Sequence, residues 1–246
     1  MKPIDAERSR ESGEPAALPA REQRRLLAFL RKLPHDFANA ILPFQIAADL
    51  LRRADGDAET LDQVQRMLEE QSAQAQRLIE ELDRTVRVLR GELEVNPSPC
   101  ELEPVVERGI AAALGKNAPS VRIERVFAPQ PIEVEADAGR LAAAVEELVD
   151  NAARFAGSQP IRVEIDRSEA AAVVRVVDRG PGIADDRMGV LFEPFAAAEA
   201  VESGWGIGLG FVRLVARAHG GSLTVERGAQ GRGMAMTIRL PLLGDG

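Results

Sequence analysis

The sequence is poor in several features that mark whole classes of protein. It has one cysteine, Cys100, and no tyrosine, and only 4% of its 246 residues are aromatic. A single cysteine cannot form an internal disulfide or a metal cluster, so a reducing cytoplasm is the simplest location. No apolar run approaches the ~20 residues that span a bilayer, and the N-terminus lacks a signal-peptide core, so we expect no membrane insertion. The net charge of -8 argues against a nucleic-acid partner.

Residues 1–18 show no periodicity, and we expect this tail to be disordered. Heptad spacing begins after it. Within residues 19–95, apolar side chains recur at steps of three and four along two stretches, which predicts two long helices. Gly56 can end the first helix and Asp57 can cap the second. Such a hairpin buries little alone, so we expect a homodimer in which two chains form a four-helix bundle. The seam residues are Leu26, Leu30, Leu33, Phe37, Ala40, Phe44, Ala47 and Leu51, then Leu61, Val64, Leu68, Gln71, Ala75, Leu78, Leu82, Thr85 and Leu89.

The rest of the chain alternates between helical and strand patterns. Residues 96–100 are the expected linker, because proline at 97 and 99 cannot continue a helix. Between 101 and 243, apolar periodicity predicts helices near 103–114, 138–155 and 207–218. It predicts strands near 121–127, 132–135, 161–165, 173–177 and 235–240. Helices on one face of a mixed sheet make an α/β sandwich, so the chain is assigned to the α+β class.

The helix of 138–155 carries polar side chains that suit a metal–phosphate ligand. Glu147 and Asn151 lie one turn apart on it, so a carboxylate and an amide oxygen project side by side. Arg154 adds a cation nearby. Hard cations such as magnesium prefer oxygen ligands, and phosphates attract a guanidinium. This combination is common on surface helices and is weak evidence alone.

Two glycine-rich turns follow. Asp178 ends an apolar strand and leads into Gly180-Pro181-Gly182, where a carboxylate could accept a hydrogen bond from an exocyclic amine such as that of adenine. Residues 204–210 alternate glycine with apolar residues and open the last helix. Glycine-rich loops at helix N-termini expose backbone N–H groups to phosphate. Both turns therefore suit a nucleotide.

Four motifs in this order resemble those of the GHKL ATPases. The segments ELVDNAARF, DRGPGI, LFEPF and GWGIGLG resemble that family's N box, first glycine box, F box and second glycine box. The arrangement is most similar to the sensor histidine kinases of two-component systems, whose last helix likewise ends in His-Gly-Gly, here at His219. The resemblance covers about residues 20 to 243. We interpret His219 itself as part of the helix end.

The resemblance implies a site for ATP and Mg²⁺. Asn151 would hold Mg²⁺ against the triphosphate, and Glu147 would help or polarise a water. Asp178 would bind the adenine amine. The stretch after Phe195 is shorter than most family lids, and Trp205, unusual at its position, either shields the nucleotide or packs on the sheet. The other nucleotide-binding residues implied are Arg154, Phe155, Gly180, Gly182, Ile183, Phe192, Phe195, Gly204, Gly206, Ile207, Gly208 and Leu209.

His35, on the first predicted helix, resembles the phosphoacceptor of the family's H box. At about 100° per residue it lies about 200° from Phe37, away from the heptad seam and toward solvent. Asp36 can hold the other imidazole N–H and raise the nucleophilicity of the ring. Asn39 occupies the position from which the family orients a hydrolytic water.

The favoured interpretation is a cytoplasmic histidine kinase that autophosphorylates His35 from Mg-ATP. It would pass the phosphate to an aspartate of a separate response-regulator receiver domain, with a phosphatase reaction as a second activity. An alternative is a kinase-derived phosphotransfer or scaffold protein whose nucleotide site no longer works. The short lid is the feature that favours this alternative. A third is a chaperone- or gyrase-type GHKL ATPase, or a serine kinase that acts on anti-anti-sigma proteins. The phosphoacceptor hairpin argues against this third group.

Overall fold

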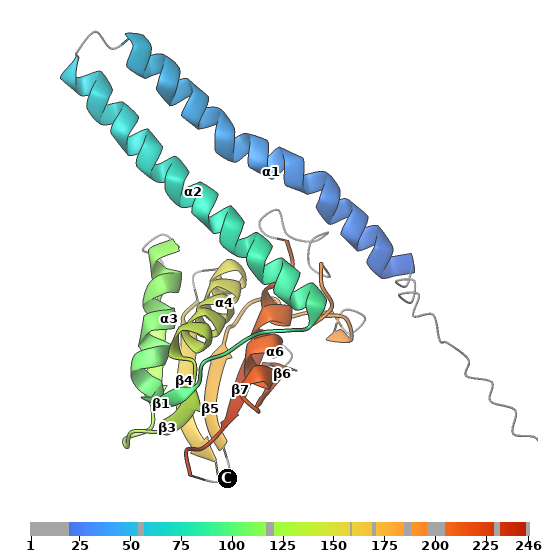
Figure 1. The fold of residues 1–246 in the computed structure, drawn as a ribbon. Helices are drawn as coiled ribbons and strands as arrows, with labels where there is room; N and C mark the ends of the chain where they lie inside the picture. Colours follow the sequence, from blue (N-terminus) through green and yellow to red (C-terminus); the bar gives the residue numbers. More distant parts are fainter. Residues whose placement is uncertain are drawn as a thin grey trace, which may run out of the picture.

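A computed structural model describes residues 20–53, 57–116, 121–157, 159–168, 171–184, 188–195, 205–228 and 232–244. Figure 1 shows two long helices that project away from a layered α/β domain. The expected tail, Gly56 of the expected hairpin turn and Gly204 of the second glycine box lie outside the described residues.

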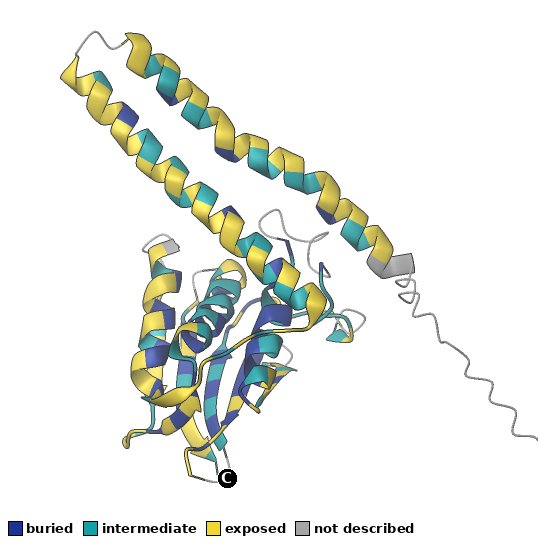
Figure 2. Ribbon diagram, in the orientation of Figure 1, coloured by how far each residue is buried: buried dark blue, intermediate teal, exposed yellow. Residues whose placement is uncertain are grey.

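The first unit is an antiparallel helical hairpin, as the heptad pattern predicted. Its helices are α1 (Ala20–Arg53) and α2 (Ala58–Arg90). The side chains that face the partner helix include Ala40, Ala47 and Val64, which are buried. Small residues at such positions let two helices approach closely. Figure 2 shows that most of the remaining hairpin surface is exposed in the single chain.

The second helix of the hairpin has a cap at each end. The carboxylate of Asp57 accepts a hydrogen bond from the backbone N–H of Thr60 at 3.0 Å, as expected for an N-cap. Gly91 ends α2 at φ +68°, in the left-handed region that glycine adopts without steric cost. These caps set where α2 begins and ends, and so how far the helix extends alongside the α/β domain.

The second unit contains a mixed five-stranded sheet in the order β2-β4-β5-β7-β6. These strands are β2 (Ile123–Phe127), β4 (Ile161–Ser168), β5 (Ala171–Val177), β7 (Met234–Pro241) and β6 (Ser222–Arg227). Strands β2 and β4 are parallel, and the other neighbours are antiparallel. A separate antiparallel pair joins β1 (Ser98–Glu101) to β3 (Glu133–Ala136). The sequence did not predict β1 or β6, and β1 takes up part of the expected linker.

Helices α3 (Leu102–Lys116), α4 (Ala138–Ala156) and α6 (Gly208–Ala218) cover one face of this sheet. Their apolar stripes and the inner face of the sheet form one core, which includes Leu141, Leu148, Phe211 and Ile238. Each fully buried side chain of this size contributes roughly 1.5–3 kcal/mol to the free energy of unfolding. The predicted α+β class and the helix-covered mixed sheet are confirmed.

His219 joins the end of α6 to the start of α4. Its Nε2 accepts a hydrogen bond from the backbone N–H of Asp137 at 2.9 Å, and its Nδ1 lies 2.8 Å from the carbonyl oxygen of Val215. A ring that accepts at Nε2 and donates at Nδ1 is the neutral Nδ1–H tautomer. The Asp137 carboxylate in turn caps α4. His219 is therefore structural, as interpreted from sequence, and fixes the two helices that carry the candidate site.

Candidate functional site

The polar face of α4 meets the first turn of α6. Glu147 and Asn151 lie one turn apart on α4, both partly buried. Gly208 opens α6 directly against Glu147, because a Cβ at this position would lie 2.6 Å from Glu147 Oε2. The second glycine box therefore comes as close to the N-box carboxylate as its backbone allows.

Asn151 is oriented by the sheet beneath it. Its amide nitrogen donates to the Sδ of Met236 on β7 at 3.5 Å, a contact that does not use the amide oxygen. That oxygen is the atom suited to magnesium. Within the described ranges, no group of three or more His, Cys, Asp or Glu side chains could hold a metal ion. A magnesium ion here would depend on Asn151 and on phosphate oxygens, which fits an ion that arrives with a nucleotide.

Asp178 is a buried carboxylate at the end of β5, with 4% of its surface exposed. Its Oδ1 accepts a hydrogen bond from the backbone N–H of Gly180 at 2.8 Å. Burial raises the pKa of the Asp178 carboxyl, and hydrogen bonds from backbone N–H groups oppose that shift. A buried acceptor held by its own turn is suited to a specific polar ligand such as an adenine amine.

The turn after Asp178 packs against the end of α4. A Cβ on Gly180 would lie 2.5 Å from the carbonyl oxygen of Phe155. Gly182 has φ +75°, which favours glycine. The first glycine box therefore depends on glycine for both space and backbone conformation. It brings Asp178 to the same side of the sheet as the C-terminal half of α4.

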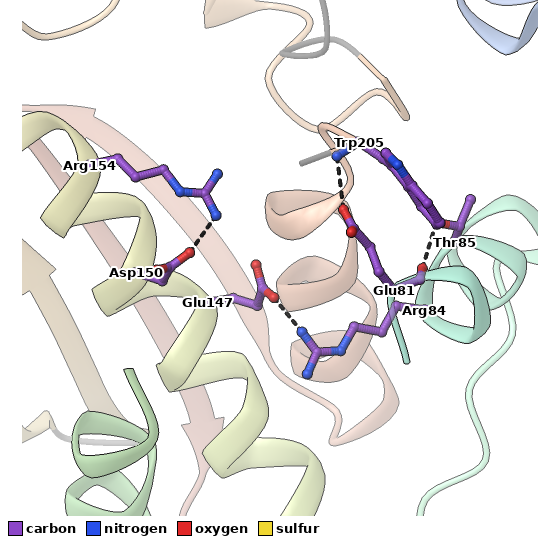
Figure 3. A network of polar contacts seen from close by, with 7 residues as sticks. All are labelled: Glu81, Arg84, Thr85, Glu147, Asp150, Arg154 and Trp205. Atoms are coloured by element: carbon purple, nitrogen blue, oxygen red, sulfur yellow. Dashed lines mark hydrogen bonds and ion pairs between the residues drawn. The ribbon is translucent and has the colours of Figure 1, made fainter. Parts of the chain in front are cut away.

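Several other residues implied by the resemblance lie around this region. Arg154 forms an ion pair with Asp150 on its own helix (Figure 3), and the ring of Phe155 is exposed. The carbonyl oxygen of Ile183 accepts from Arg227 at 3.0 Å. Three more belong to the F box and the start of α6: Phe192 lies under the Arg213 guanidinium, Leu209 packs on the core, and Gly206 has φ +70°.

Phe195 and Ile207 lie in a second apolar cluster, between the hairpin and the α/β domain. We call it the docking cluster: Phe29, Ala40, Leu78, Phe195, Trp205 and Ile207. Phe29 of α1 stacks on Phe195 with ring centroids 4.7 Å apart and meets Trp205 edge to face at 4.9 Å. Phe195 has φ +63°, a left-handed conformation that costs about 1–2 kcal/mol in a non-glycine residue. The packing against Phe29 helps to hold it there.

Trp205 therefore packs on the hairpin and not on the sheet, which corrects that part of its predicted role. Trp205 is buried in the docking cluster, to which α1 contributes Phe29 and α2 contributes Leu78. Its indole N–H also donates to Asp36 Oδ2 of α1 at 3.0 Å, and its backbone N–H donates to Glu81 Oε1 of α2 at 2.9 Å. Burial raises the pKa of the Glu81 carboxyl, while the bond from Trp205 opposes that shift.

Two ion pairs complete the contact between the units. Arg84 of α2 pairs with Glu147 of α4 (Figure 3), and its guanidinium lies 5.2 Å from the centroid of the Phe211 ring. Arg25 of α1 pairs with Glu193 of the F box at 2.5 Å. Sequence reasoning missed Arg25, Glu81 and Arg84, because nothing in a helical repeat marks a partner so distant in the chain.

His35 is exposed on α1, with 75% of its side-chain surface accessible, as the helical spacing predicted. Its Nδ1 lies 3.1 Å from the amide nitrogen of Asn39 and 3.6 Å from Asp36 Oδ1. The second distance is too long for a hydrogen bond. The structure thus brings His35, Asp36 and Asn39 together on one helix.

The chain is similar to known proteins along most of its length. Residues 136–244 match the HATPase_c family, described as histidine kinase-, DNA gyrase B-, and HSP90-like ATPase. The signal transduction histidine-protein kinase AfsQ2 of Streptomyces coelicolor is 36% identical over 117 residues, 46% of this chain and 22% of that protein. The sensor-type histidine kinase PrrB of Mycobacterium leprae is 30% identical over 157 residues, 63% of this chain and 34% of that protein.

A solved structure agrees. The mycobacterial sensor histidine kinase MprB superposes with a TM-score of 0.53 at 27% identity, over 60% of this chain and 98% of that one. The chain spans between about a fifth and a third of the length of the curated relatives it matches. None of the helices described has both the length and the apolar character to cross a bilayer.

Proposed function

This chain belongs to the sensor histidine kinases that have a GHKL-type ATP-binding domain, and from that membership we propose that it is an ATP-dependent protein-histidine kinase. It transfers the γ-phosphate of ATP to His35 and then to an aspartate of a separate response-regulator receiver domain. The observation that carries this proposal is the presence, in one chain, of an exposed histidine on a helical hairpin and a glycine-closed polar site on α4. We place the reaction in the cytoplasm, where ATP is found.

The nucleotide would lie between the polar face of α4, the Asp178 turn and the first turn of α6. Asp178 would accept the adenine amine, and its burial supports selectivity because an unpaired buried carboxylate is costly. Gly206 and Gly208 would let backbone N–H groups approach the phosphates at the N-terminus of α6. Asn151 would hold Mg²⁺, which offsets phosphate charge when bound.

In the transfer, the Nε2 lone pair of His35 forms the new bond to the γ-phosphorus. The bond from that phosphorus to the bridging oxygen breaks and ADP leaves with the electron pair. Nε2 is the reacting nitrogen because Nδ1 faces Asn39 and Asp36 within the helix. Asp36 then accepts a hydrogen bond from Nδ1–H and offsets the positive charge on the ring. Asn39, beside the ring, supports a phosphatase reaction through an oriented water.

The proposal includes a homodimer. Large apolar side chains of the hairpin are exposed in the single chain, which is costly for a protein that works alone. A four-helix bundle with a second copy would cover them. They are Leu27, Leu30, Ile41, Leu42, Ile46, Leu51, Leu61, Ile79, Val86 and Leu89.

The test is incubation of the chain with γ-labelled ATP and Mg²⁺. We expect acid-labile, alkali-stable label that His35→Gln abolishes, while Gln45→Asn, a polar change elsewhere on α1, leaves it unaffected. Label that persists in His35→Gln would refute the assignment of His35. Absence of label together with absence of nucleotide binding by calorimetry would instead favour a phosphotransfer or scaffold protein.

A further inference from the structure

The side chain of Met236 on β7 contacts the amide of Asn151, and we propose that this methionine is a positioning residue for magnesium binding. Its thioether sulfur holds the nitrogen end of the amide, which leaves the oxygen end for an ion. This role rests on the proposed function, because Asn151 is the residue expected to hold Mg²⁺. Met236 acts only through Asn151.

The sulfur determines which end of the amide faces the sheet. An asparagine amide has a donor end and an acceptor end, whereas a thioether sulfur can only accept. The nitrogen of Asn151 lies 3.5 Å from the sulfur of Met236 and donates to it. If the amide were turned over, its oxygen would face the sulfur and two acceptors would meet. The contact with Met236 therefore favours one of the two orientations.

The sulfur of Met236 is the acceptor that this face of β7 offers. Strand β7 lies between β5 and β6, so its backbone groups are used in the two ladders. Ile238 and Leu240, the next positions on the same face, have apolar side chains that pack in the core. Met236 is 1% exposed, so water has little access to its sulfur. A β-branched residue, which strands favour, would fill this space but could not accept from Asn151.

A competing acceptor lies one turn earlier on α4. Glu147 and Asn151 are at positions i and i+4, a spacing at which a carboxylate and an amide can hydrogen-bond. The carboxylate of Glu147 only accepts, so it too would attract the nitrogen end of the amide. A nitrogen drawn there would bring its partly positive protons to the polar face of α4, where they would repel a cation. The bond to Met236 keeps that nitrogen on the sheet.

The kind of bond sets the size of the effect. A thioether is a weak acceptor, and the loss of one neutral hydrogen bond changes an equilibrium modestly. We expect the part of the nucleotide affinity that depends on Mg²⁺ to change about threefold without Met236. The part that does not depend on Mg²⁺ should stay the same, because the proposed base contact is made by Asp178.

The first experiment measures the dissociation constant of a non-hydrolysable ATP analogue for the full chain by calorimetry. It is measured with Mg²⁺ and with EDTA, and the ratio of the two constants is the magnesium enhancement. Met236→Leu nearly conserves the volume of the side chain and removes the acceptor. We expect it to lower the enhancement about threefold while the constant in EDTA stays the same.

Met234→Leu is the matched control for this experiment. Met234 is also buried on β7, and it meets the Asp178 turn through its backbone carbonyl, which accepts from the N–H of Asp178 at 3.0 Å. Loss of this second thioether leaves that backbone bond in place, so the enhancement should equal that of the wild-type chain. A threefold loss in Met234→Leu as well would be a general effect of the strand and would overturn the role of Met236.

A third variant separates this role from the proposed function. Asn151→Ala removes the amide and should abolish the magnesium enhancement. If the wild-type chain shows no enhancement, the magnesium role of Asn151 itself fails. If Asn151→Ala abolishes the enhancement while Met236→Leu keeps it in full, Asn151 holds the ion and the role of Met236 alone is overturned.

The second experiment needs no nucleotide. The side-chain NH₂ of Asn151, assigned by its absence in Asn151→Asp, is followed by NMR relaxation in the free protein. We expect its order parameter to fall in Met236→Leu but not in Met234→Leu. Selenomethionine-labelled wild type should also keep the order, because selenium leaves an acceptor in place. Equal order in all of these forms would show that Met236 only fills space, whether or not the nucleotide binds.

Discussion

The indole nitrogen of Trp205 lies 3.0 Å from a carboxylate oxygen of Asp36, although 169 positions separate the two residues in the sequence. One belongs to the second glycine box and the other is next to the exposed His35. The bond is part of an apolar and polar contact that also includes Phe29 and Glu81. The loop proposed to close on phosphate and the helix that carries the phosphoacceptor are therefore in direct contact, so a change in one reaches the other without an intermediate chain of residues.

Replacement of the buried carboxylate tests the adenine site. Asp178→Asn keeps an oxygen to accept from the backbone N–H of Gly180 but loses the negative charge. We expect nucleotide affinity to fall about tenfold or more, because hydrogen bonds to charged groups are worth roughly 1.5–3 kcal/mol. Calorimetric titration with Mg-ATP measures it. Affinity equal to wild type would show that Asp178 does not bind the base.

The same variant should respond to pH in a defined direction. Burial raises the pKa of Asp178, so the folded chain favours the protonated form. The stability that this group contributes is full below its unfolded pKa and is lost as pH rises through its raised folded pKa. Asp178→Asn cannot ionise, so at neutral pH it should be at least as stable as wild type. Urea unfolding should show this advantage shrink at acid pH, and an advantage that grew there would contradict the assignment.

The first glycine box should be intolerant of one methyl group. A Cβ on Gly180 would lie 2.5 Å from the Phe155 carbonyl, a backbone atom that cannot turn aside. Gly180→Ala should therefore lower the free energy of unfolding by about 1–3 kcal/mol. Gly189→Ala is the control, since a Cβ there meets nothing within 4 Å. Thermal denaturation compares the two variants. Equal midpoints would mean that the turn can shift away from α4 to make room for the methyl group at no cost in stability.

Much of this fold could be predicted, because local patterns carry it. Heptad spacing predicted α1 and α2, alternation predicted β4 and β7, and a nearly continuous apolar run predicted β5, all near their observed bounds. Strand β6 was not predicted, because four of its six residues are polar or charged: Ser222, Thr224, Glu226 and Arg227. Strand β1 was not predicted because it contains a proline and forms by pairing with β3, a contact that the local sequence does not indicate.

The candidate site likewise contains residues that could be predicted from local motifs and contacts that could not. Glu147, Asn151 and Asp178 were identified from motifs, and the structure places Gly208 against Glu147 and Gly180 against Asp178, as those motifs led us to expect. The pairing of Arg84 with Glu147 and the position of Trp205 against α1 were not predictable. Both depend on how the hairpin and the α/β domain meet, which the local patterns of either unit do not reveal.

A charge on the face of α1 that is exposed in the single chain should weaken the proposed dimer. Ile41 is exposed in the single chain and lies among other uncovered apolar side chains. Ile41→Glu would place a carboxylate in the bundle interior, so we expect association to weaken by about 2 kcal/mol or more, roughly thirtyfold. Sedimentation equilibrium measures it. Gln63→Glu adds the same charge at a polar exposed position of α2 and should leave association unchanged; equal effects would argue against a bundle formed through α1.

The docking cluster should separate from the core of the α/β domain when its central ring is removed. Phe29 contacts both Phe195 and Trp205, and burial of rings like these is worth roughly 3–5 kcal/mol when they are truncated to alanine. In Phe29→Ala we expect a red-shifted Trp205 emission while the domain core, which does not include Phe29, still unfolds cooperatively. Leu27→Ala, an exposed neighbour on α1, should leave the emission unchanged. If Phe29→Ala keeps the wild-type emission, the polar bonds to Asp36 and Glu81 hold Trp205 without the ring stack, and the apolar contact is not what joins the two units.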